Sequence, residues 1–264
     1  MLKIIIGIIK VILPLSLILI VLLGILGGGW GEKQLPNNHP FYRGELLLIS
    51  HRGVVDQAPE NTLAAAARAR KLGFLALEFD LKQSSDSQFY LFHDRNSLRL
   101  FGEEFPLKRL TLKEIQQKPL LHNQQSSSHR VPDLDSFTSE FANEFNFYLD
   151  IKRHGNNRYQ RLTSRIADYL SQYGLTDQAW VGSDFLFTAY LEYRYPEIHT
   201  VFTGPGDWTI FIYRWIPKRF RPDFIISYAN EITSGHVEWL KKKDLLHRRM
   251  VYGVNGDNYL QVKT

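Results

Sequence analysis

The sequence FLALEFDLKQSSDSQFYLFHD, residues 74–94, decides the fold class of this 264-residue chain. Its first part, residues 74–81, is an apolar run of strand length that contains Glu78 and Asp80. Residues two apart on a strand point to the same face, so these two carboxylates lie side by side. A second apolar run ends at His93. Polar groups therefore follow strand-like runs, which is where an α/β fold places its chemistry.

Strand-like and helix-like runs alternate through the rest of the chain. The predicted strands are residues 46–50, 74–81, 88–92, 147–151, 179–182, 200–203, 223–227 and 250–254. The predicted helices are residues 61–72, 110–117, 134–143, 159–173, 186–195, 208–219 and 237–243. This alternation predicts a parallel sheet, and nearly eight repeats predict a TIM (β/α)8-type barrel over residues 46–264.

The N-terminal segment, residues 1–29, is almost entirely apolar, with Lys3 and Lys10 as its only charges. At about 1.5 Å per residue, a helix following Lys10 is long enough to cross a bilayer. We predict a transmembrane signal anchor, with a cleaved signal peptide as the alternative. The two lysines predict a cytoplasmic N-terminus and a catalytic domain on the non-cytoplasmic side of the membrane. Residues 30–45, rich in Gly, Pro and Asn, predict a linker.

The composition limits the class of partner. Lys and Arg number 32 against 27 Asp and Glu, a net charge of +5. This mild excess suits an anionic substrate or membrane surface, and it falls short of the concentrated basic face of a nucleic-acid binder. The absence of cysteine excludes disulfides, thiolate metal sites and a cysteine nucleophile. The oligomeric state is left open.

Paired acids indicate a metal site. Glu78 and Asp80, buried together, would repel one another unless a cation lay between them, and a hard ion such as Ca²⁺ or Mg²⁺ suits carboxylate oxygens. A solvated strand face is the alternative, but strands of a parallel barrel have no freely solvated face. Asp150 and Lys152 repeat the spacing on a later strand and would add a third oxygen ligand and a cation for a phosphoryl oxygen. An ordinary ion pair at a strand end is the alternative for these two.

Two histidines are candidates for acid–base chemistry. His51 and His93 each follow an apolar run, and an ordinary histidine pKa of about 6.5 suits an acid–base pair at neutral pH. Arg52 offers a planar donor fork for phosphate. Glu60 opens a predicted helix, where it is either a site residue or a favourable charge near the helix N-terminus.

Together these residues resemble the glycerophosphodiester phosphodiesterase family. The matching motifs are His51-Arg52-Gly53, Pro59-Glu60-Asn61-Thr62, Glu78-x-Asp80, His93-Asp94, Val131-Pro132-x-Leu134 and Asp150-x-Lys152. The resemblance covers most of residues 46–255. It implies a TIM-barrel enzyme that hydrolyses glycerophosphodiesters to glycerol 3-phosphate and an alcohol with Ca²⁺ or Mg²⁺. The implied roles are general acid and base for His51 and His93, phosphate contacts for Arg52 and Lys152, and metal ligands for Glu78, Asp80 and Asp150, with Glu60 nearby.

The sequence also departs from the family pattern. Asp150 stands where the family more often has Glu, and residues 84–87 lack the glycine of a Thr-x-Asp-Gly turn. Residues 252–255, Tyr-Gly-Val-Asn, replace Trp-Thr-Val-Asn. The chain stops at Thr264, before the last strand that the family usually has, so we expect a barrel that is incomplete at its C-terminus.

Two other functions are compatible with the sequence. A membrane-associated lysophospholipase D would use the basic and aromatic residues 208–221 against lipid headgroups, although a packed barrel helix explains them equally well. A protein of another class, a catalytically inactive anchored binding protein with a truncated barrel, is suggested by the early C-terminus. The alcohol moiety of the substrate is not specified by the sequence.

Overall fold

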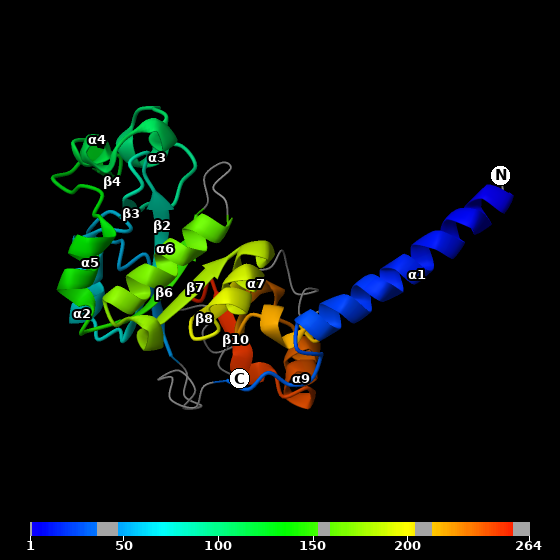
Figure 1. Cartoon of the computed structure of the whole chain (residues 1–264). Helices are drawn as coiled ribbons and strands as arrows, with labels where there is room; N and C mark the ends of the chain where they lie inside the picture. Colours follow the sequence, from blue (N-terminus) through cyan, green and yellow to red (C-terminus); the bar gives the residue numbers. More distant parts are fainter. Residues whose placement is uncertain (1, 36–46, 153–158, 204–212, 256–264) are drawn as a thin grey trace.

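A parallel sheet organises the computed structural model, which describes residues 2–35, 47–152, 159–203 and 213–255. Seven parallel strands follow the order β1-β2-β6-β7-β8-β9-β10 (Figure 1). They are β1 Ile49–His51, β2 Ala76–Gln83, β6 Asn146–Ile151, β7 Ala179–Ser183, β8 His199–Thr203, β9 Phe224–Tyr228 and β10 Arg249–Tyr252. Each strand lies beside the next parallel strand along the chain, as in an α/β barrel. The predicted α/β class is confirmed.

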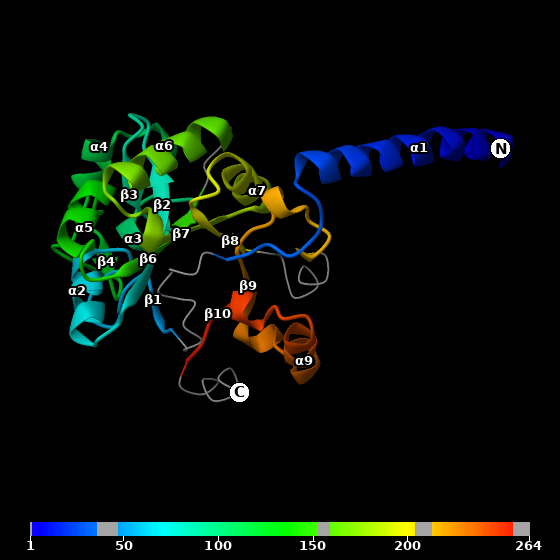
Figure 2. The ribbon, with the colours of Figure 1, turned by 60° about the horizontal axis from the view of Figure 1, so that its bottom comes forward.

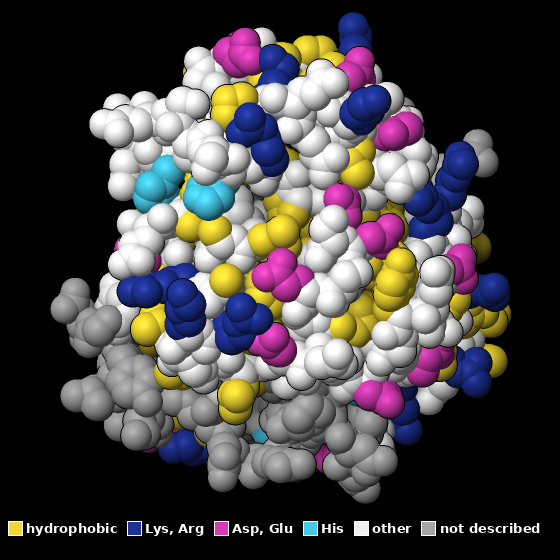
Figure 3. Space-filling view, turned by 90° about the vertical axis from the view of Figure 1, so that its left-hand side faces the viewer, with side chains coloured by type: hydrophobic (Ala, Val, Ile, Leu, Met, Phe, Trp, Pro, Cys, Tyr) yellow, Lys and Arg dark blue, Asp and Glu magenta, His cyan; other side chains and the backbone are white. Residues whose placement is uncertain are grey.

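Helices cover the outer side of this sheet (Figure 2). They are α2 Leu63–Lys71, α5 Leu134–Phe141, α6 Tyr159–Gln172, α7 Phe185–Arg194 and α9 Ser234–Lys242. Alternate residues of β2, among them Phe79, pack outward against Phe137 and Phe147, with the Phe79 ring centroid 4.7 and 5.6 Å from the centroids of the other two rings. The intervening residues Glu78 and Asp80 therefore face the barrel interior. On the outer face shown in Figure 3, basic and acidic side chains are interspersed.

The short strand β3, Phe89–Leu91, corrects one prediction. It pairs antiparallel with β2 and is not a barrel strand. The turn between them is closed by the amide of Ser87, which donates to the carbonyl of Ser84, and such a short connection can only join antiparallel strands. The polar residues 122–130 contain the turn and the second strand of a small antiparallel hairpin. The elements after β3 are α3 Leu98–Phe101, the 3-10 helix η2 Leu107–Arg109, α4 Leu112–Gln116, β4 Leu121–His122 and β5 Gln125–Ser126.

Among the described residues, the ring of strands is open on one side, because β10 pairs only with β9 and β1 pairs only with β2. The expected incompleteness at the C-terminus concerns residues 256–264, which lie outside the described residues. A cavity of about 1750 Å³ lies along this opening and is lined by apolar residues, among them Ile49, Trp180 and Met250, and by charged residues such as Lys33 and Arg248. It reaches His51 at the carboxyl end of the strands. Part of the predicted helix 208–219 lies outside the described residues. From residue 213 on, the chain is mainly turn and the 3-10 helix η4, Lys218–Phe220.

The N-terminal helix α1, Leu2–Leu26, extends away from the barrel (Figure 1). Its side chains are described for residues 12–26, and most of these are exposed. Among the described parts of the chain, no helix is both long and apolar enough to cross a membrane. The structure thus does not support the predicted transmembrane anchor.

The described part of the predicted linker packs against the barrel. The indole nitrogen of Trp30 donates to the carbonyl of Trp215 at 2.8 Å. The ammonium of Lys33 lies 2.5 Å from a carboxylate oxygen of Glu192 and 2.7 Å from one of Asp223. Asp223 precedes β9, so this contact is made at the amino end of the barrel strands, opposite the end that carries the predicted site.

Candidate active site

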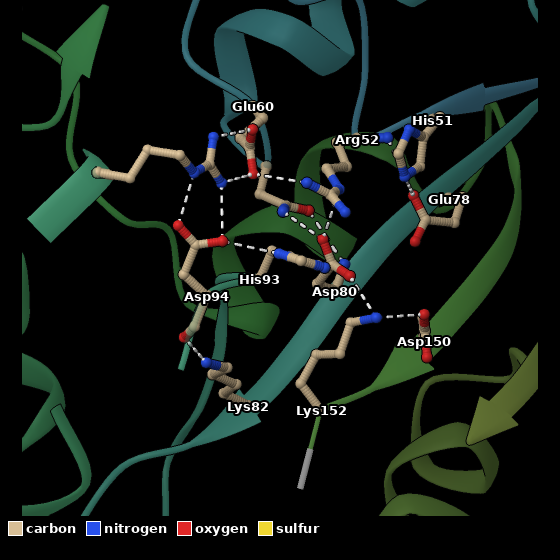
Figure 4. Close-up of polar contacts among 12 residues, drawn as sticks. His51, Arg52, Glu60, Glu78, Asp80, Lys82, His93, Asp94, Asp150 and Lys152 are labelled. Carbon is tan, nitrogen blue, oxygen red and sulfur yellow. Dashed lines mark hydrogen bonds and ion pairs between the residues drawn. The ribbon is translucent and has the colours of Figure 1, made fainter. Parts of the chain in front are cut away.

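Six of the eight predicted site residues, all except Glu60 and His93, converge on β1, β2 and β6 or directly after them (Figure 4). The parallel register pairs His51 with Glu78, and Asp80 with Asp150. Residues in register on adjacent parallel strands place their side chains on the same face. The sheet itself therefore brings together groups that are up to 99 positions apart in the sequence.

Three carboxylates form the centre of the site. Glu78, Asp80 and Asp150 are each at most 6% exposed, and each offers an oxygen within 4.8 Å of the others. Burial and the neighbouring charges of Asp80 and Asp150 raise the pKa of Glu78 well above its ordinary value. Burial also raises the pKa of Asp150, although Lys152 opposes the effect. The cluster thus carries more negative charge than its protein surroundings neutralise.

A strained turn after β1 places Arg52 over these acids. Arg52 has a φ of 57°, and its amide donates to the Glu78 carboxylate at 3.0 Å. At Gly53, φ is 82° and an added Cβ would lie 2.6 Å from the backbone of Ala65 in α2. Only glycine fits this close approach of turn and helix. The turn then directs the Arg52 guanidinium to Asp80, at 2.9 Å.

Lys152 supplies a second cation. Its ammonium lies 2.5 Å from an Asp150 oxygen and 3.2 Å from an Asp80 oxygen. It follows the end of β6, and its amide donates to the carbonyl of Leu81. Arg52 and Lys152 therefore flank the carboxylates on two sides, with donors that a phosphate could also use.

His51 lies at the mouth of the site with its side chain 45% exposed. Its Nε2 is 3.6 Å from an oxygen of Glu78 and hydrogen-bonds the hydroxyl of Tyr252. Partial burial, together with the nearby charge of Arg52, lowers the pKa of His51 to about 4. The imidazole is neutral at neutral pH and is able to accept a proton.

His93 has a different environment. Its Nδ1 lies 2.7 Å from Oδ1 of Asp94. Burial alone would raise the pKa of Asp94, but hydrogen bonds from Arg99 and His93 outweigh it and hold this pKa at about 2. Because an ionised carboxylate only accepts hydrogen bonds, Nδ1 of His93 must be the protonated nitrogen. The other ring nitrogen points toward Asp80 (Figure 4).

The carboxylate cluster fits a hard divalent cation. Oε1 of Glu78 is buried and has no hydrogen-bond partner within the described residues. Within the described residues, the three acids form ion pairs with two permanently charged side chains, Arg52 and Lys152, and oxygen donors of this kind suit Ca²⁺ or Mg²⁺. Glu78, Asp80 and Asp150 would hold such an ion. When bound, it would neutralise the excess negative charge and polarise a phosphoryl oxygen.

The model of the glycerophosphoryl diester phosphodiesterase family matches residues 51–188, just over half of the chain. The chain belongs to the glycerophosphodiester phosphodiesterase family. As a member of it, the protein is a hydrolase of phosphoric diesters. The match begins at His51 and includes every predicted site residue.

Individual proteins of the glycerophosphodiester phosphodiesterase family are similar to this chain, which supports the family assignment. YhdW of Bacillus subtilis (strain 168), whose name assigns it provisionally to this activity, is 26% identical over 80% of this chain and 82% of its own length. Human glycerophosphodiester phosphodiesterase 1 is 28% identical over 50% of this chain and 41% of its own length.

Solved structures share the fold. An Oleispira antarctica phosphodiesterase in complex with sn-glycerol-3-phosphate has a TM-score of 0.72, at 19% identity over 84% of this chain and 91% of its own. The glycerophosphodiester phosphodiesterase of Agrobacterium tumefaciens has a TM-score of 0.67, at 20% identity over 83% and 92%. These structural similarities indicate that the sheet of this chain has the TIM-barrel architecture of the family.

Glu60 occupies a different place from the other predicted metal ligands. Its carboxylate lies 2.9 Å from Arg52 and 2.7 Å from Arg99. These two arginines lower its pKa against the opposing effect of burial. Glu60 thus joins the edge of the site through arginines and is not among the three clustered carboxylates.

Sequence reasoning missed four residues of the site. Buried Asn61 donates to the Asp80 carboxylate at 2.7 Å, and buried Lys82 hydrogen-bonds the carbonyl of Asp94. Arg99 contacts Asp94, and Tyr252 contacts His51. Lys82 could have been found, because it lies two residues beyond Asp80 and shares its face of β2. Nothing in the local sequence identifies the distant contacts of Arg99 and Tyr252.

Proposed function

We propose that the protein hydrolyses glycerophosphodiesters to glycerol 3-phosphate and an alcohol, with a divalent cation held by Glu78, Asp80 and Asp150. The observation that carries this proposal is the convergence of two histidines, three buried carboxylates and two cationic side chains at one end of the barrel. Active sites of α/β barrels are built at this end.

Each group of residues has a separate role in the proposed reaction. Arg52 and Lys152 bind the phosphate and orient it. Neutral His51 accepts the proton of the attacking hydroxyl, and His93 donates a proton to the leaving alcohol as its P–O bond breaks. Asp94 lies against Nδ1 of His93 at 2.7 Å and stabilises the charge of the protonated ring. The attacking group is the neighbouring hydroxyl of the substrate, which forms a cyclic phosphate that water then opens.

The test is to incubate the full chain with glycerophosphocholine and either Ca²⁺ or Mg²⁺, and to measure glycerol 3-phosphate. We expect product with at least one of the two ions and none after chelation. No product with either ion would refute the proposal.

A lysophospholipase D activity is the second candidate, and the 1750 Å³ cavity favours it. The cavity leads from His51 and Glu78 along the open side of the barrel past apolar residues such as Ile49, Trp180 and Met250. The apolar part of this cavity could hold an acyl chain next to the reacting groups. Turnover of a lysophospholipid that exceeds turnover of glycerophosphocholine would favour this activity. The residues 208–221, on which the sequence argument depended, are described only from residue 213 on.

A catalytically inactive binding protein is disfavoured by the complete set of groups. The side of a membrane on which the domain lies stays a prediction, because no structural observation tests it.

A further inference from the structure

Arg99 joins two acids that sequence reasoning left unconnected. It lies in the short helix α3, outside the barrel strands. Its Nε and Nη2 lie 2.6 and 2.9 Å from the two carboxylate oxygens of Asp94. Its Nη1 and Nη2 lie 2.7 Å from the two oxygens of Glu60. The guanidinium thus forms bidentate pairs with both carboxylates, the geometry that gives such contacts their directional specificity.

Each of these acids contacts a proposed functional group. Oδ1 of Asp94 accepts from Nδ1 of His93 at 2.7 Å. Oε1 of Glu60 accepts from Nη1 of Arg52 at 2.9 Å. A continuous chain of polar contacts therefore runs from His93 through Arg99 to Arg52. The two acids that link these residues, Asp94 and Glu60, are labelled in Figure 4.

The same place could be mistaken for a second metal site. Glu60, His93 and Asp94 offer ligand atoms within 4.8 Å of one another. The guanidinium of Arg99 already satisfies both carboxylates there with one positive charge. This cluster is therefore held by a side chain, in contrast to the cluster of Glu78, where a buried oxygen has no partner within the described residues.

We propose that Arg99 is a positioning residue for the hydrolysis: it fixes Asp94 so that His93 is held with Nδ1 protonated and its other nitrogen directed into the site. Its effect on turnover rests on the proposed function, whereas its effect on the tautomer of His93 does not. An isolated exposed ion pair would have little effect on either. Arg99 differs because it holds two partly buried acids from separate loops at once.

The experiment compares Arg99→Gln and Arg99→Lys with Arg95→Gln, a change of an exposed arginine four residues away. We expect Arg99→Gln to lower kcat by about 10- to 100-fold, by analogy with the loss of outer-shell partners that orient metal-bound histidines. KM should change less, because Arg52 keeps its contact with Asp80. A lysine cannot form both bidentate pairs, so Arg99→Lys should be intermediate. Arg95→Gln should behave as the wild type.

The second readout is the ¹⁵N NMR spectrum of the His93 imidazole, recorded at a pH where the ring is neutral and assigned with His93→Gln. We expect the Nδ1–H tautomer in the wild type and in Arg95→Gln, and a mixture of tautomers in Arg99→Gln. A wild-type tautomer in Arg99→Gln together with unchanged kcat would overturn the proposal. If the wild type does not hydrolyse glycerophosphocholine but Arg99→Gln still changes the tautomer, the proposed function fails and the positioning role stands.

Discussion

Two clusters of buried acids lie at opposite ends of the barrel strands, and they are completed in different ways. At the amino end, Glu192 and Asp223 share the ammonium of Lys33. The second oxygen of Glu192 accepts from the hydroxyl of Thr200 at 2.6 Å. At the carboxyl end, Arg52 and Lys152 contact the three acids but leave Oε1 of Glu78 without a partner among the described residues.

This difference indicates that the amino-end cluster contributes to stability and the carboxyl-end cluster to catalysis. Buried charges are tolerated only when they are paired, and removal of one partner is strongly destabilising. The amino-end cluster is closed by the protein's own lysine, whose ammonium lies within 2.7 Å of an oxygen of each acid. The carboxyl-end cluster is incomplete and opens to solvent beside His51. Catalytic residues of α/β barrels lie at the carboxyl end, whereas the opposite end contributes to stability.

The largest expected effect is on catalysis at the carboxyl end. His93→Gln or His51→Gln should lower kcat/KM for glycerophosphocholine by about 10²- to 10⁴-fold, because each removes a general acid or base. The matched control is His247→Gln, a change of an exposed histidine that contacts Asp244. Equal activity of His93→Gln and His247→Gln would contradict the assignment of His93.

The next effect tests the closed cluster. Lys33→Met should lower the free energy of unfolding by about 3 kcal/mol, because it leaves Glu192 and Asp223 buried without their common cation. The kcat of the folded fraction should not change. Denaturant unfolding measures this, with Lys71→Met as a control at an exposed lysine of α2. A loss of stability no greater than that of the control would show that Lys33 does not complete the cluster.

Metal binding should distinguish the carboxyl-end cluster from the amino-end cluster. Ca²⁺ or Mg²⁺ at about 100 times its Kd should stabilise the wild type by about 2.7 kcal/mol, since an ion that binds only the folded state raises its stability. Glu78→Gln should reduce this gain, and Glu192→Gln should leave it intact. Thermal unfolding with and without each ion, followed by chelation, is the measurement. An equal gain in the Glu78 variant would place the ion elsewhere.

A pH dependence of stability is also expected from the closed cluster. Burial, together with the charge of Asp223, raises the pKa of Glu192 from 4.5 to about 8. Between these pH values the folded state binds more protons than the unfolded state, so this group makes the free energy of unfolding fall as pH rises from 4.5 to 8. Glu192→Gln should flatten this part of the profile. Denaturant unfolding at several pH values tests it, and an unchanged slope would count against the raised pKa.

Much of the fold could be predicted because buried parallel strands are apolar runs separated by helices. The same reasoning misassigned β3, since a short apolar run does not reveal the direction of its strand. The pairing of Glu78, Asp80 and Asp150 was predictable from spacing two apart and from the common edge of parallel strands.

Contacts between distant segments were not predictable in this way. Arg99 meets Glu60 across 39 positions, and Tyr252 meets His51 across 201. Lys33 lies in the segment predicted as a linker, although its partners lie 159 positions or more away. Local patterns describe single elements, whereas these contacts depend on how the barrel closes around its ends.

The contact of Lys33 also determines where a catalytic fragment can begin. A fragment that starts at Gln34, the boundary suggested by a linker over residues 30–45, would lack the ammonium shared by Glu192 and Asp223. Its two carboxylates at the amino end of the barrel would be left to water or to protonation. Fragments intended for crystallisation or assay should retain the chain from Gly27 onward, where the backbone first hydrogen-bonds Arg219.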